Sequence, residues 1–430
     1  MAIRLAACAT HPIQVQVPLF RELAACPDID LQVFYANDDN TRPTYNPAFG
    51  VTVEWDTPIL EGYSYRFLQN RAPLSNAVVD PGMVRRLFSS SAPQIRQHLV
   101  QGQFDALLVP GYTRLFYLQA IEGARRAGAA VLFRGNNRDE TGGRRPRLRE
   151  AVRNVALKGL YRRIDAFLSV GKYMRRHFRQ FGVAEERIFD TPYCIDDRLF
   201  ADQRERFLPQ RDAIRSELGI PPGAVALLYS GKISPKKAPG VLAAALCAVG
   251  RRDDLHVIVM GDGPLRAEFE EKVRPVLGDH LKMLGFINQS QVGRYHAASD
   301  ALVLCSDYGE SWGLVVNEAM TFGRPSLVSD GVGCREDLVL EGETGFVFPR
   351  GDSGRLAEHI HSLLADRELL TAMGRNAEER IKSFSVARNV EGIREALEVV
   401  VPRSSSRSRR ARANRSSRSV RPGSGPLAQL

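Results

Sequence analysis

Two glutamates eight residues apart, Glu310 and Glu318, belong to the most informative segment of the sequence. The segment follows the apolar run Ala301–Cys305, and after Gly313 we expect a helix that begins near Leu314. The first amides of a helix have no partner within it and can bind an anion. Glu318, about one turn into the helix, could accept hydrogen bonds from two adjacent ribose hydroxyls, and Glu310 could reach a group held at the helix start. Alternatively, both are ordinary acids stabilised by the helix dipole.

Two lysines five residues apart, Lys232 and Lys237, lie in the loop after the apolar run Val225–Tyr229. Gly231 allows that loop to turn tightly, and both ammonium groups could reach one diphosphate. The loop is not a Walker motif, because Ile233 follows the Gly-Lys pair and no glycine stands five residues before Gly231. The alternative is a solvated basic turn.

A third segment, Val259-Met-Gly261-Asp-Gly263-Pro-Leu-Arg266, has the pattern of a strand, a G-x-G turn and a helix. A dinucleotide-binding fingerprint would need a third glycine where Arg266 stands. A plain tight turn is therefore the default interpretation.

The elements that must position these residues form two series of apolar runs alternating with helical patterns. We expect strands at Ile3–Ala9, Asp30–Tyr35, Ala106–Val109, Ala130–Arg134 and Ala166–Ser169, and then at Val225–Tyr229, His256–Met260, Ala301–Cys305, Ser326–Val328 and Gly345–Phe348. We expect helices between them, including Leu115–Ala127, Arg147–Tyr161, Gly240–Gly250 and Pro264–Val276. The stretch from Asp196 to Gly223, charged and irregular in pattern, separates the two series. The prediction is an α/β protein with two Rossmann-like, doubly wound domains facing a cleft, with ligands outside the carboxyl ends of the strands.

Together, these segments resemble family 4 of the retaining glycosyltransferases, which has the two-domain GT-B fold. The Glu310-to-Glu318 spacing matches the family's E-x7-E pattern, and Ser230-Gly231-Lys232 through Lys237 matches its glycine and basic residues. Further matches are Gly261-Asp-Gly263-Pro264, Gly285-Phe286, the stretch from Val328 to Gly345, and the domain-junction segment from Phe189 to Phe200. The resemblance covers roughly residues 165–385, and the combination is more specific than any single motif.

The resemblance implies a role for each matching residue. Lys232 and Lys237 would hold the donor diphosphate, Glu318 the ribose, and the amides of Gly313, Leu314 and Val315 a phosphate. Glu310 would touch the transferred sugar, which makes Glu310, Lys232 and Lys237 the candidate catalytic residues. Gly231 and Ser311 complete the expected donor site. The anomeric configuration would be retained, with no metal and no cofactor, because the nucleotide sugar is a substrate.

The resemblance also implies the domain division. Residues 1–195 would bind the acceptor, residues 196–385 would bind the donor, and a helix within 386–402 would pack back on the first domain. Residues 403–430 form an Arg/Ser-rich tail, which we expect to be disordered because its composition cannot bury a core.

The acceptor side departs from the family pattern. Thr10-His11-Pro12 replaces the usual glycine-rich loop after the first strand, and Gly135-Asn136-Asn137-Arg138 occupies a loop where relatives often have a histidine. His11 and Asn136 are therefore the candidate acceptor or proton-shuttle residues, although a histidine satisfied within the fold is equally consistent with His11. Lys232 stands where the family usually has arginine, so its contact would be a point charge.

Metal chemistry has little support in the sequence. Asp28-Ile29-Asp30 matches the D-x-D of metal-dependent glycosyltransferases, but its position indicates a turn leading into a strand. The six cysteines include no C-x-x-C pair and have no histidine at zinc-ligand spacing, so we expect reduced cysteines in the core of a cytosolic protein.

The charge of the chain is unevenly distributed. The net charge is +10 over 430 residues, but the tail from 401 to 430 contains eight arginines and no acid. The remainder is nearly neutral, which disfavours a nucleic-acid-binding face. Residues 134–163 hold ten basic and three acidic residues, which would suit an anionic glycan or lipid-linked acceptor or a solvated helix face. The tail could attach the protein to the inner face of an anionic cytoplasmic membrane.

The expected function is sugar transfer from a nucleotide-diphosphate sugar to a glycan or lipid-linked acceptor, as in cell-envelope or exopolysaccharide synthesis. One alternative is a nucleotide-sugar epimerase on the same fold. Another is a non-catalytic partner subunit, which the intact set of two lysines and two glutamates argues against. The base, the sugar, the acceptor and the oligomeric state are not encoded in any recognisable pattern.

Overall fold

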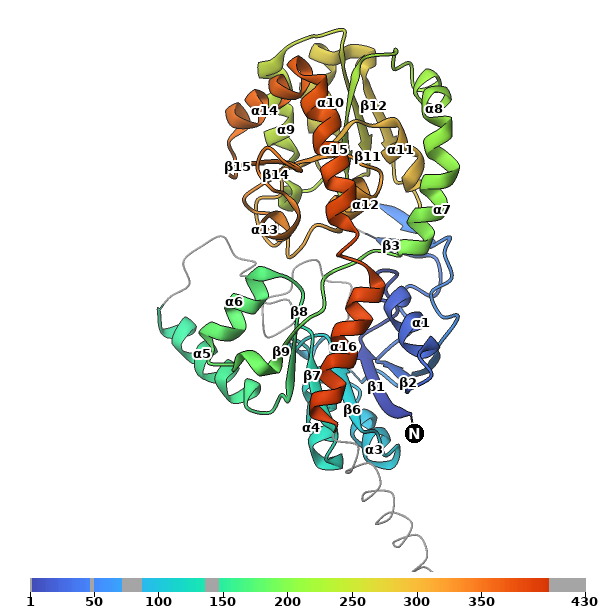
Figure 1. The fold of residues 1–430 in the computed structure, drawn as a ribbon, viewed down its shortest axis with the longest axis vertical. Helices are drawn as coiled ribbons and strands as arrows, with labels where there is room; N and C mark the ends of the chain where they lie inside the picture. The colour runs from blue at the N-terminus through green and yellow to red at the C-terminus, as the bar shows by residue number, and fades with distance from the viewer. Residues whose placement is uncertain (1, 47–49, 72–86, 136–146, 402–430) are drawn as a thin grey trace, which may run out of the picture.

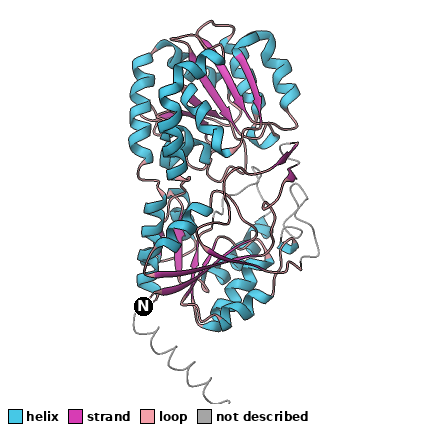
Figure 2. Cartoon of the chain, turned by 90° about the vertical axis from the view of Figure 1, so that its right-hand side faces the viewer, coloured by secondary structure: helices cyan, strands magenta, loops and turns pink. Residues whose placement is uncertain are grey.

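Two parallel sheets, each covered by helices, make up the protein (Figures 1 and 2). The structure is a computed structural model that describes residues 2–46, 50–71, 87–135 and 147–401. The predicted fold class, two doubly wound α/β domains, is confirmed. No helix in these ranges is both long and apolar enough to cross a membrane.

The N-terminal sheet has seven parallel strands in the order β5-β2-β1-β6-β7-β8-β9. Their bounds are β1 Ile3–Ala9, β2 Ile29–Tyr35, β5 Ser64–Phe67, β6 Ala106–Val109, β7 Ala130–Phe133, β8 Ala166–Ser169 and β9 Ile188–Asp190. The helices are α1 Val17–Ala25, α3 Gln94–Gln101, α4 Leu115–Ala127, α5 Arg147–Tyr161 and α6 Lys172–Gln180. A small antiparallel hairpin, β3 Thr44–Asn46 and β4 Val51–Val53, stands apart from this sheet.

The C-terminal sheet has six parallel strands in the order β12-β11-β10-β13-β14-β15. Their bounds are β10 Val225–Ser230, β11 Leu255–Met260, β12 Leu281–Gly285, β13 Ala301–Leu304, β14 Ser326–Ser329 and β15 Gly345–Phe348. The helices of this part are α7 Asp197–Phe207, α8 Arg211–Glu217, α9 Pro239–Val249, α10 Arg266–Leu277, α11 Val292–Ala298, α12 Leu314–Thr321, α13 Arg335–Leu338, α14 Ser353–Ala365 and α15 Arg367–Ile381. Strands β10, β11, β13 and β14 are buried on both faces, which explains their continuous apolar runs.

The last described helix, α16 (Val386–Val400), returns to the N-terminal domain and packs against α1, β8 and β9 (Figure 1). Its residues Val390, Ile393 and Leu397 share a buried cluster with the first strands of the chain. The Ser385 hydroxyl accepts a hydrogen bond from the Arg388 amide at 3.1 Å and so caps the helix start.

The segment between the two domains corrects one prediction. Residues 196–223 contain helices α7 and α8 where an irregular stretch was expected. The Asp196 carboxylate caps α7 by accepting from the Leu199 amide at 3.1 Å, and Phe200 and Phe207 are buried in a core cluster of the C-terminal domain. Most charged residues of this stretch lie on the exposed sides of these helices and obscured the apolar spacing, although Arg215 is buried and pairs with Asp300 at 3.0 Å.

Two smaller predictions also need correction. The helix after β11 begins at Arg266, because Pro264 and Leu265 still belong to the turn. The cysteines are not all in the core: Cys8, Cys194, Cys305 and Cys334 are buried, but Cys26 is half-buried and Cys247 is exposed. All six are unbridged.

Among the described residues the two domains contact each other at several places, and at two of these a backbone amide donates to an aspartate. The amide of Lys172, at the start of α6, donates to Asp337 Oδ1 at 3.0 Å, from the N-terminal domain to α13. On the hairpin side, the Ser290 amide donates to Asp56 Oδ1 at 3.2 Å. The first contact joins the helices that follow β8 and β14, so carboxyl ends of strands from the two sheets approach each other.

Candidate active site

The loops after β10 and β13 form the centre of the candidate site. These two strands are neighbours in the middle of the C-terminal sheet, where the strand order reverses. Loops at such a point diverge and leave room for a ligand outside the strand ends. The Asp307 amide donates to the Lys236 carbonyl at 3.0 Å and holds the two loops together. The residues predicted to do chemistry come from these two loops.

Lys237 and Glu310 form a buried ion pair across the two loops. Their side chains are 15% and 11% exposed, and the Ser306 hydroxyl donates to the same glutamate oxygen, Oε2, at 3.1 Å. Burial alone would raise the pKa of Glu310, but Lys237, Lys236 and the hydrogen bonds outweigh it and lower the pKa. Glu310 is therefore a carboxylate at neutral pH and cannot serve as a proton donor there.

Three lysines of one short loop concentrate positive charge beside this pair. Burial, followed by the charges of Lys236 and Lys237, lowers the pKa of Lys232. Gly231 allows the loop to turn here, because its φ of 139° is a conformation that L side chains rarely adopt. A cluster of cations that repel one another in this way favours a bound dianion such as a diphosphate.

The start of α12 lies next to the Glu310 loop and is fixed from both sides. Gly313 has a φ of 100°, which L side chains rarely adopt, and a Cβ there would lie 3.1 Å from Leu304 and Val332. The Trp312 indole donates to Asn317 Oδ1 at 2.8 Å, so the loop is tied to the helix that follows it. The amides of Leu314 and Val315 are at the helix start, where intrahelical partners are lacking.

The remaining predicted donor residues have distinct positions. Glu318 is one turn into α12, and its side chain is 13% exposed. Ser311 is half-buried, and its carbonyl packs tightly against Gly333 from the loop after β14. Glu310 pairs with Lys237 and Glu318 with His296, so the two acids take part in different contacts.

His11, one of the two acceptor-side candidates, is not joined to this centre in the described part of the chain. His11 follows β1 in the other domain, where Thr10 Oγ1 lies 3.1 Å from its Nδ1. Burial lowers the pKa of His11, Asp39 opposes this shift and Arg114 adds to it. Within the described ranges no hydrogen bond or ion pair connects His11 to the lysines or glutamates above. Asn136 lies outside the described residues.

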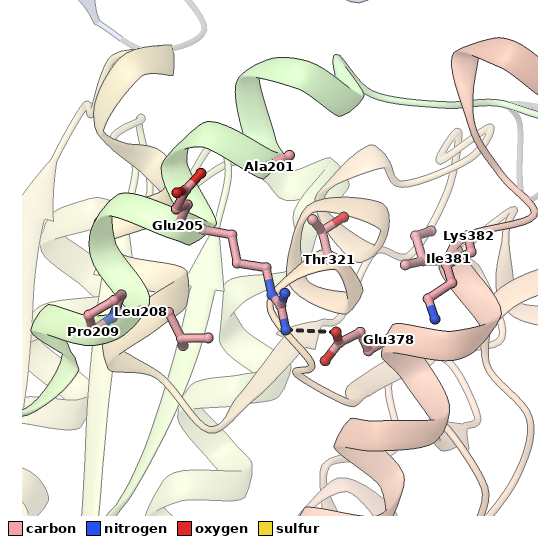
Figure 3. Close-up of a pocket in the computed structure, with 9 residues that line it drawn as sticks. Ala201, Glu205, Leu208, Pro209, Thr321, Glu378, Ile381 and Lys382 are labelled. Carbon is pink, nitrogen blue, oxygen red and sulfur yellow. Dashed lines mark hydrogen bonds and ion pairs between the residues drawn. The ribbon is translucent and has the colours of Figure 1, made fainter.

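A hollow of about 700 Å³ lies elsewhere, between α7 and α15 (Figure 3). It is lined by Ala201, Arg204, Glu205, Leu208, Pro209, Thr321, Glu378, Ile381 and Lys382. Arg204 and Glu378 pair with each other across it at 2.7 Å. None of the predicted site residues lines this hollow, so the chemistry is assigned to the strand ends.

The sequence analysis missed three residues that hold the site together, namely Ser306, Asn317 and Asp337. Ser306 anchors Glu310, and its position two residues after the end of β13 could have indicated this. Asn317 donates to the carbonyl of Tyr193 at 3.1 Å and so links α12 to the domain junction. Neither this link nor the contact of Asp337 with Lys172 has a sequence signal, because the partners lie more than a hundred residues apart.

The C-terminal part of the chain matches the model of a known protein family. Residues 210–380 match the model of the family described as "Glycosyl transferases group 1". This match contains the two strand-end loops and the start of α12.

Curated relatives match over a similar length. A D-inositol 3-phosphate glycosyltransferase of Nocardia farcinica is 33% identical over 201 residues, which is 44% of this chain and 44% of that protein. An alpha-D-kanosaminyltransferase of Streptomyces kanamyceticus is 29% identical over 202 residues, 46% of this chain and 50% of that protein. The chain thus matches about half the length of these relatives.

Solved structures match over nearly the whole chain. A glycosyltransferase from Rickettsia africae ESF-5 has a TM-score of 0.68 at 12% identity, covering 94% of this chain and 99% of its own. Anabaena HepE in complex with UDP has a TM-score of 0.68 at 19% identity, covering 93% of this chain and 100% of its own. At these identities the similarity concerns the fold.

Proposed function

Since residues 210–380 form a domain of the glycosyl transferases group 1 family within a GT-B fold, we propose that the protein transfers a sugar from a nucleotide-diphosphate donor to an acceptor. The observation that carries the proposal is the juxtaposition of Lys237 with Glu310 beside the start of α12. A diphosphate needs cations and free amides, and a sugar needs a fixed carboxylate acceptor for its hydroxyls. Both are provided by two adjoining loops.

Each group has a defined task in this proposal. Lys232 and Lys237, with the amides of Leu314 and Val315, bind the diphosphate and stabilise the charge that grows on it as it leaves. Glu310 accepts hydrogen bonds from the sugar, and Glu318 accepts them from the ribose. Glu310 is occupied by Lys237 and Ser306, which disfavours its use as a nucleophile. We therefore propose attack on the face from which the diphosphate departs, with retained configuration.

Metal independence is also part of the proposal. Lys232, Lys236 and Lys237 together with the positive end of α12 provide the charge that a divalent cation would otherwise supply. Activity should therefore survive treatment with a chelator. An absolute requirement for manganese or magnesium, restored by adding the ion back, would rule out this arrangement of the donor site.

The proposed acceptor is a glycan or lipid-linked sugar of cell-envelope or exopolysaccharide synthesis, approached from the N-terminal domain. Attachment to an anionic membrane would bring the protein to such acceptors. On helix α5, Val152 and Val155 are 63% and 72% exposed and share one face with Ala156 and Gly159. Three exposed cations lie in α5 or just after it, namely Lys158, Arg162 and Arg163. The tail contains eight more arginines. Exposed valines flanked by cations suit a membrane of anionic lipid.

A vesicle-sedimentation assay separates the two attachment elements. We expect the full chain to sediment with vesicles containing anionic lipid at low salt and not with neutral vesicles. The double substitution Val152→Glu/Val155→Glu should weaken the part of this binding that α5 contributes. Deletion of residues 403–430 should weaken the part that the tail contributes. Val399→Glu is the matched control, because Val399 is 60% exposed on α16, away from α5. No sedimentation of the full chain would refute membrane attachment.

A binding screen tests the donor assignment. Titration calorimetry with UDP, GDP and other nucleoside diphosphates should find at least one ligand for the wild type. Glu318→Ala should weaken its binding by about 1.5–3 kcal/mol, the range for a charge-assisted hydrogen bond. Equal affinities of the variant and the wild type would exclude the ribose contact. Binding of none of the nucleotides would refute the proposed function.

A further inference from the structure

A fully buried histidine stands behind the carboxylate assigned to the ribose. His296, in α11, has an exposed fraction of 0%, and its Nε2 lies 3.4 Å from Glu318 Oε2. Neither ring nitrogen makes a hydrogen bond of good geometry with any described group. Buried polar atoms without partners are rare because water cannot compensate them, so this imidazole needs a partner. Glu318 is the acid paired with it.

The position of His296 is fixed by its surroundings rather than by Glu318. Its ring stacks on Phe322 with centroids 5.6 Å apart and planes 21° apart. Its carbonyl accepts hydrogen bonds from Arg324 Nε at 3.1 Å and from the Ser299 hydroxyl at 3.0 Å. A ring held by stacking and by its own backbone cannot move away from the carboxylate easily.

Glu318, by contrast, has little else to orient it. Among the residues that the structure describes, no hydrogen bond and no second ion pair holds its carboxylate. Its side chain is partly open to solvent on one side and faces the buried imidazole on the other. A glutamate has three rotatable bonds, so an unrestrained carboxylate would lose much of its freedom on binding a diol.

We propose that His296 is the positioning residue for the ribose-binding carboxylate. Nε2–H of His296 donates to Glu318 Oε2, which leaves Oε1 to accept from the two adjacent ribose hydroxyls. When the ribose binds, the distance of 3.4 Å between His296 Nε2 and Glu318 Oε2 shortens to that of a hydrogen bond. The buried imidazole then gains a hydrogen-bond acceptor while the carboxylate gains the ribose hydroxyls as donors. His296 touches neither the nucleotide nor the sugar. The inference rests on the proposed function, because it assumes that a nucleoside diphosphate binds at α12.

The test is ribose discrimination, which a merely structural role would not alter. The affinities of UDP and 2′,3′-dideoxy-UDP are measured by calorimetry, with GDP and its dideoxy analogue in parallel. The wild type should prefer the ribonucleotide by roughly tenfold or more, as expected for charge-assisted hydrogen bonds. His296→Ala should reduce this ratio to within about threefold, mainly by weakening ribonucleotide binding. His296→Gln, whose amide can donate from nearly the same place as Nε2, should restore most of it.

His359→Ala provides a matched control. His359 is also buried in this domain, is stacked on Phe346 with centroids 4.4 Å apart, and has an Nε2 without a partner. Its loss should destabilise the domain without changing the discrimination ratio. If His296→Ala does not fold, His296→Gln and His296→Asn are compared instead, and the Asn variant, with its shorter reach, should discriminate less.

The outcomes separate the inference from the proposed function. A wild type that binds neither UDP nor GDP contradicts the proposed function. A wild type that discriminates and a His296→Ala variant that discriminates equally well overturn the positioning role. Loss of discrimination in both His296→Ala and His359→Ala also overturns it, because the effect would then follow from general destabilisation.

Discussion

Lys237 and Glu310 are separated by 73 residues in the chain, yet they form a buried ion pair at the carboxyl ends of β10 and β13. The lysine expected on the diphosphate thus neutralises the glutamate expected on the sugar. A nucleotide sugar that binds here must share Lys237 between its diphosphate and Glu310. The ion pair therefore holds both side chains in place for the ligand, and it keeps Glu310 ionised.

Removing the lysine should affect turnover more than binding. Lys237→Met should lower turnover by about 100-fold or more, because a preorganised cation acts mainly on the charge of the transition state. The affinity for the nucleoside diphosphate should fall less. Lys272→Met is the control, since Lys272 is an exposed lysine paired with Glu268 on α10. Normal turnover in Lys237→Met would eliminate the proposed role of this residue.

Measurements of the free energy of unfolding distinguish the structural role of this ion pair from its catalytic role. Lys237→Met leaves the buried Glu310 without its ion-pair partner, with only Ser306 and the charge of Lys236 to stabilise it, which should cost about 3–5 kcal/mol in the free energy of unfolding. Adding Glu310→Gln should recover much of that loss but no turnover. Urea unfolding and turnover of the single and double variants provide the comparison. Recovery of activity in the double variant would show that the single variant had failed only by misfolding.

The contact between the domains should depend on Asp337. This aspartate caps α6 by accepting from the Lys172 amide at 3.0 Å, and Gly171 at the helix start has no side chain to replace it. Asp337→Ala should cost about 1 kcal/mol as a lost cap and should also loosen the two domains. Small-angle scattering should give a larger radius of gyration. Asp352→Ala, which removes the cap of α14 at 2.8 Å within one domain, should lose similar stability without expansion. Equal radii for all three proteins would contradict a role in domain closure.

Acid should destabilise the C-terminal domain through His256. This imidazole is 2% exposed in β11 and stacks on His280 with centroids 4.1 Å apart. Burial and then His280 lower the pKa of His256 to about 4. In the unfolded chain a histidine binds its proton near pH 6.5, so the unfolded state takes up more protons between pH 6.5 and 4, and stability falls over that range. The loss attributable to His256 is at most about 3 kcal/mol.

His256→Val checks this pH dependence. Valine fits a buried strand and removes the titrating group. Urea unfolding at pH 7.5 and pH 5 should show a smaller loss on acidification in the variant than in the wild type. The same loss in both proteins would show that other groups, such as His11 and His359, account for it.

Much of the fold was predictable because parallel strands have a strong signal. Continuous apolar runs such as Val225–Tyr229 are buried on both sheet faces, and the helices Leu115–Ala127 and Arg147–Tyr161 lie where their periodicity predicts them. The short edge strands β5, β9 and β12 were not predicted, because an edge strand is only partly buried and lacks a continuous run. The helices at 197–217 were missed because charge on their exposed faces hid the apolar spacing.

The site was predictable only where its residues are close in sequence. The two lysines in one loop and the two glutamates around one helix start could be read directly. The contacts of Lys237 with Glu310, of His296 with Glu318 and of Lys172 with Asp337 depend on how strands and domains come together. The spacing of residues along a chain contains no information on such tertiary distances.

Proton NMR of the reaction itself tests the central claim most directly. The protein is incubated with UDP-sugars and GDP-sugars, with and without candidate acceptors, and the anomeric proton of the first product is observed before mutarotation. We predict that the nucleoside diphosphate is released, that the transferred sugar keeps the configuration it had in the donor, and that Lys237→Met forms both products about 100-fold or more slowly. An inverted product would contradict the one-face mechanism. An epimerised nucleotide sugar formed without an acceptor would contradict sugar transfer altogether.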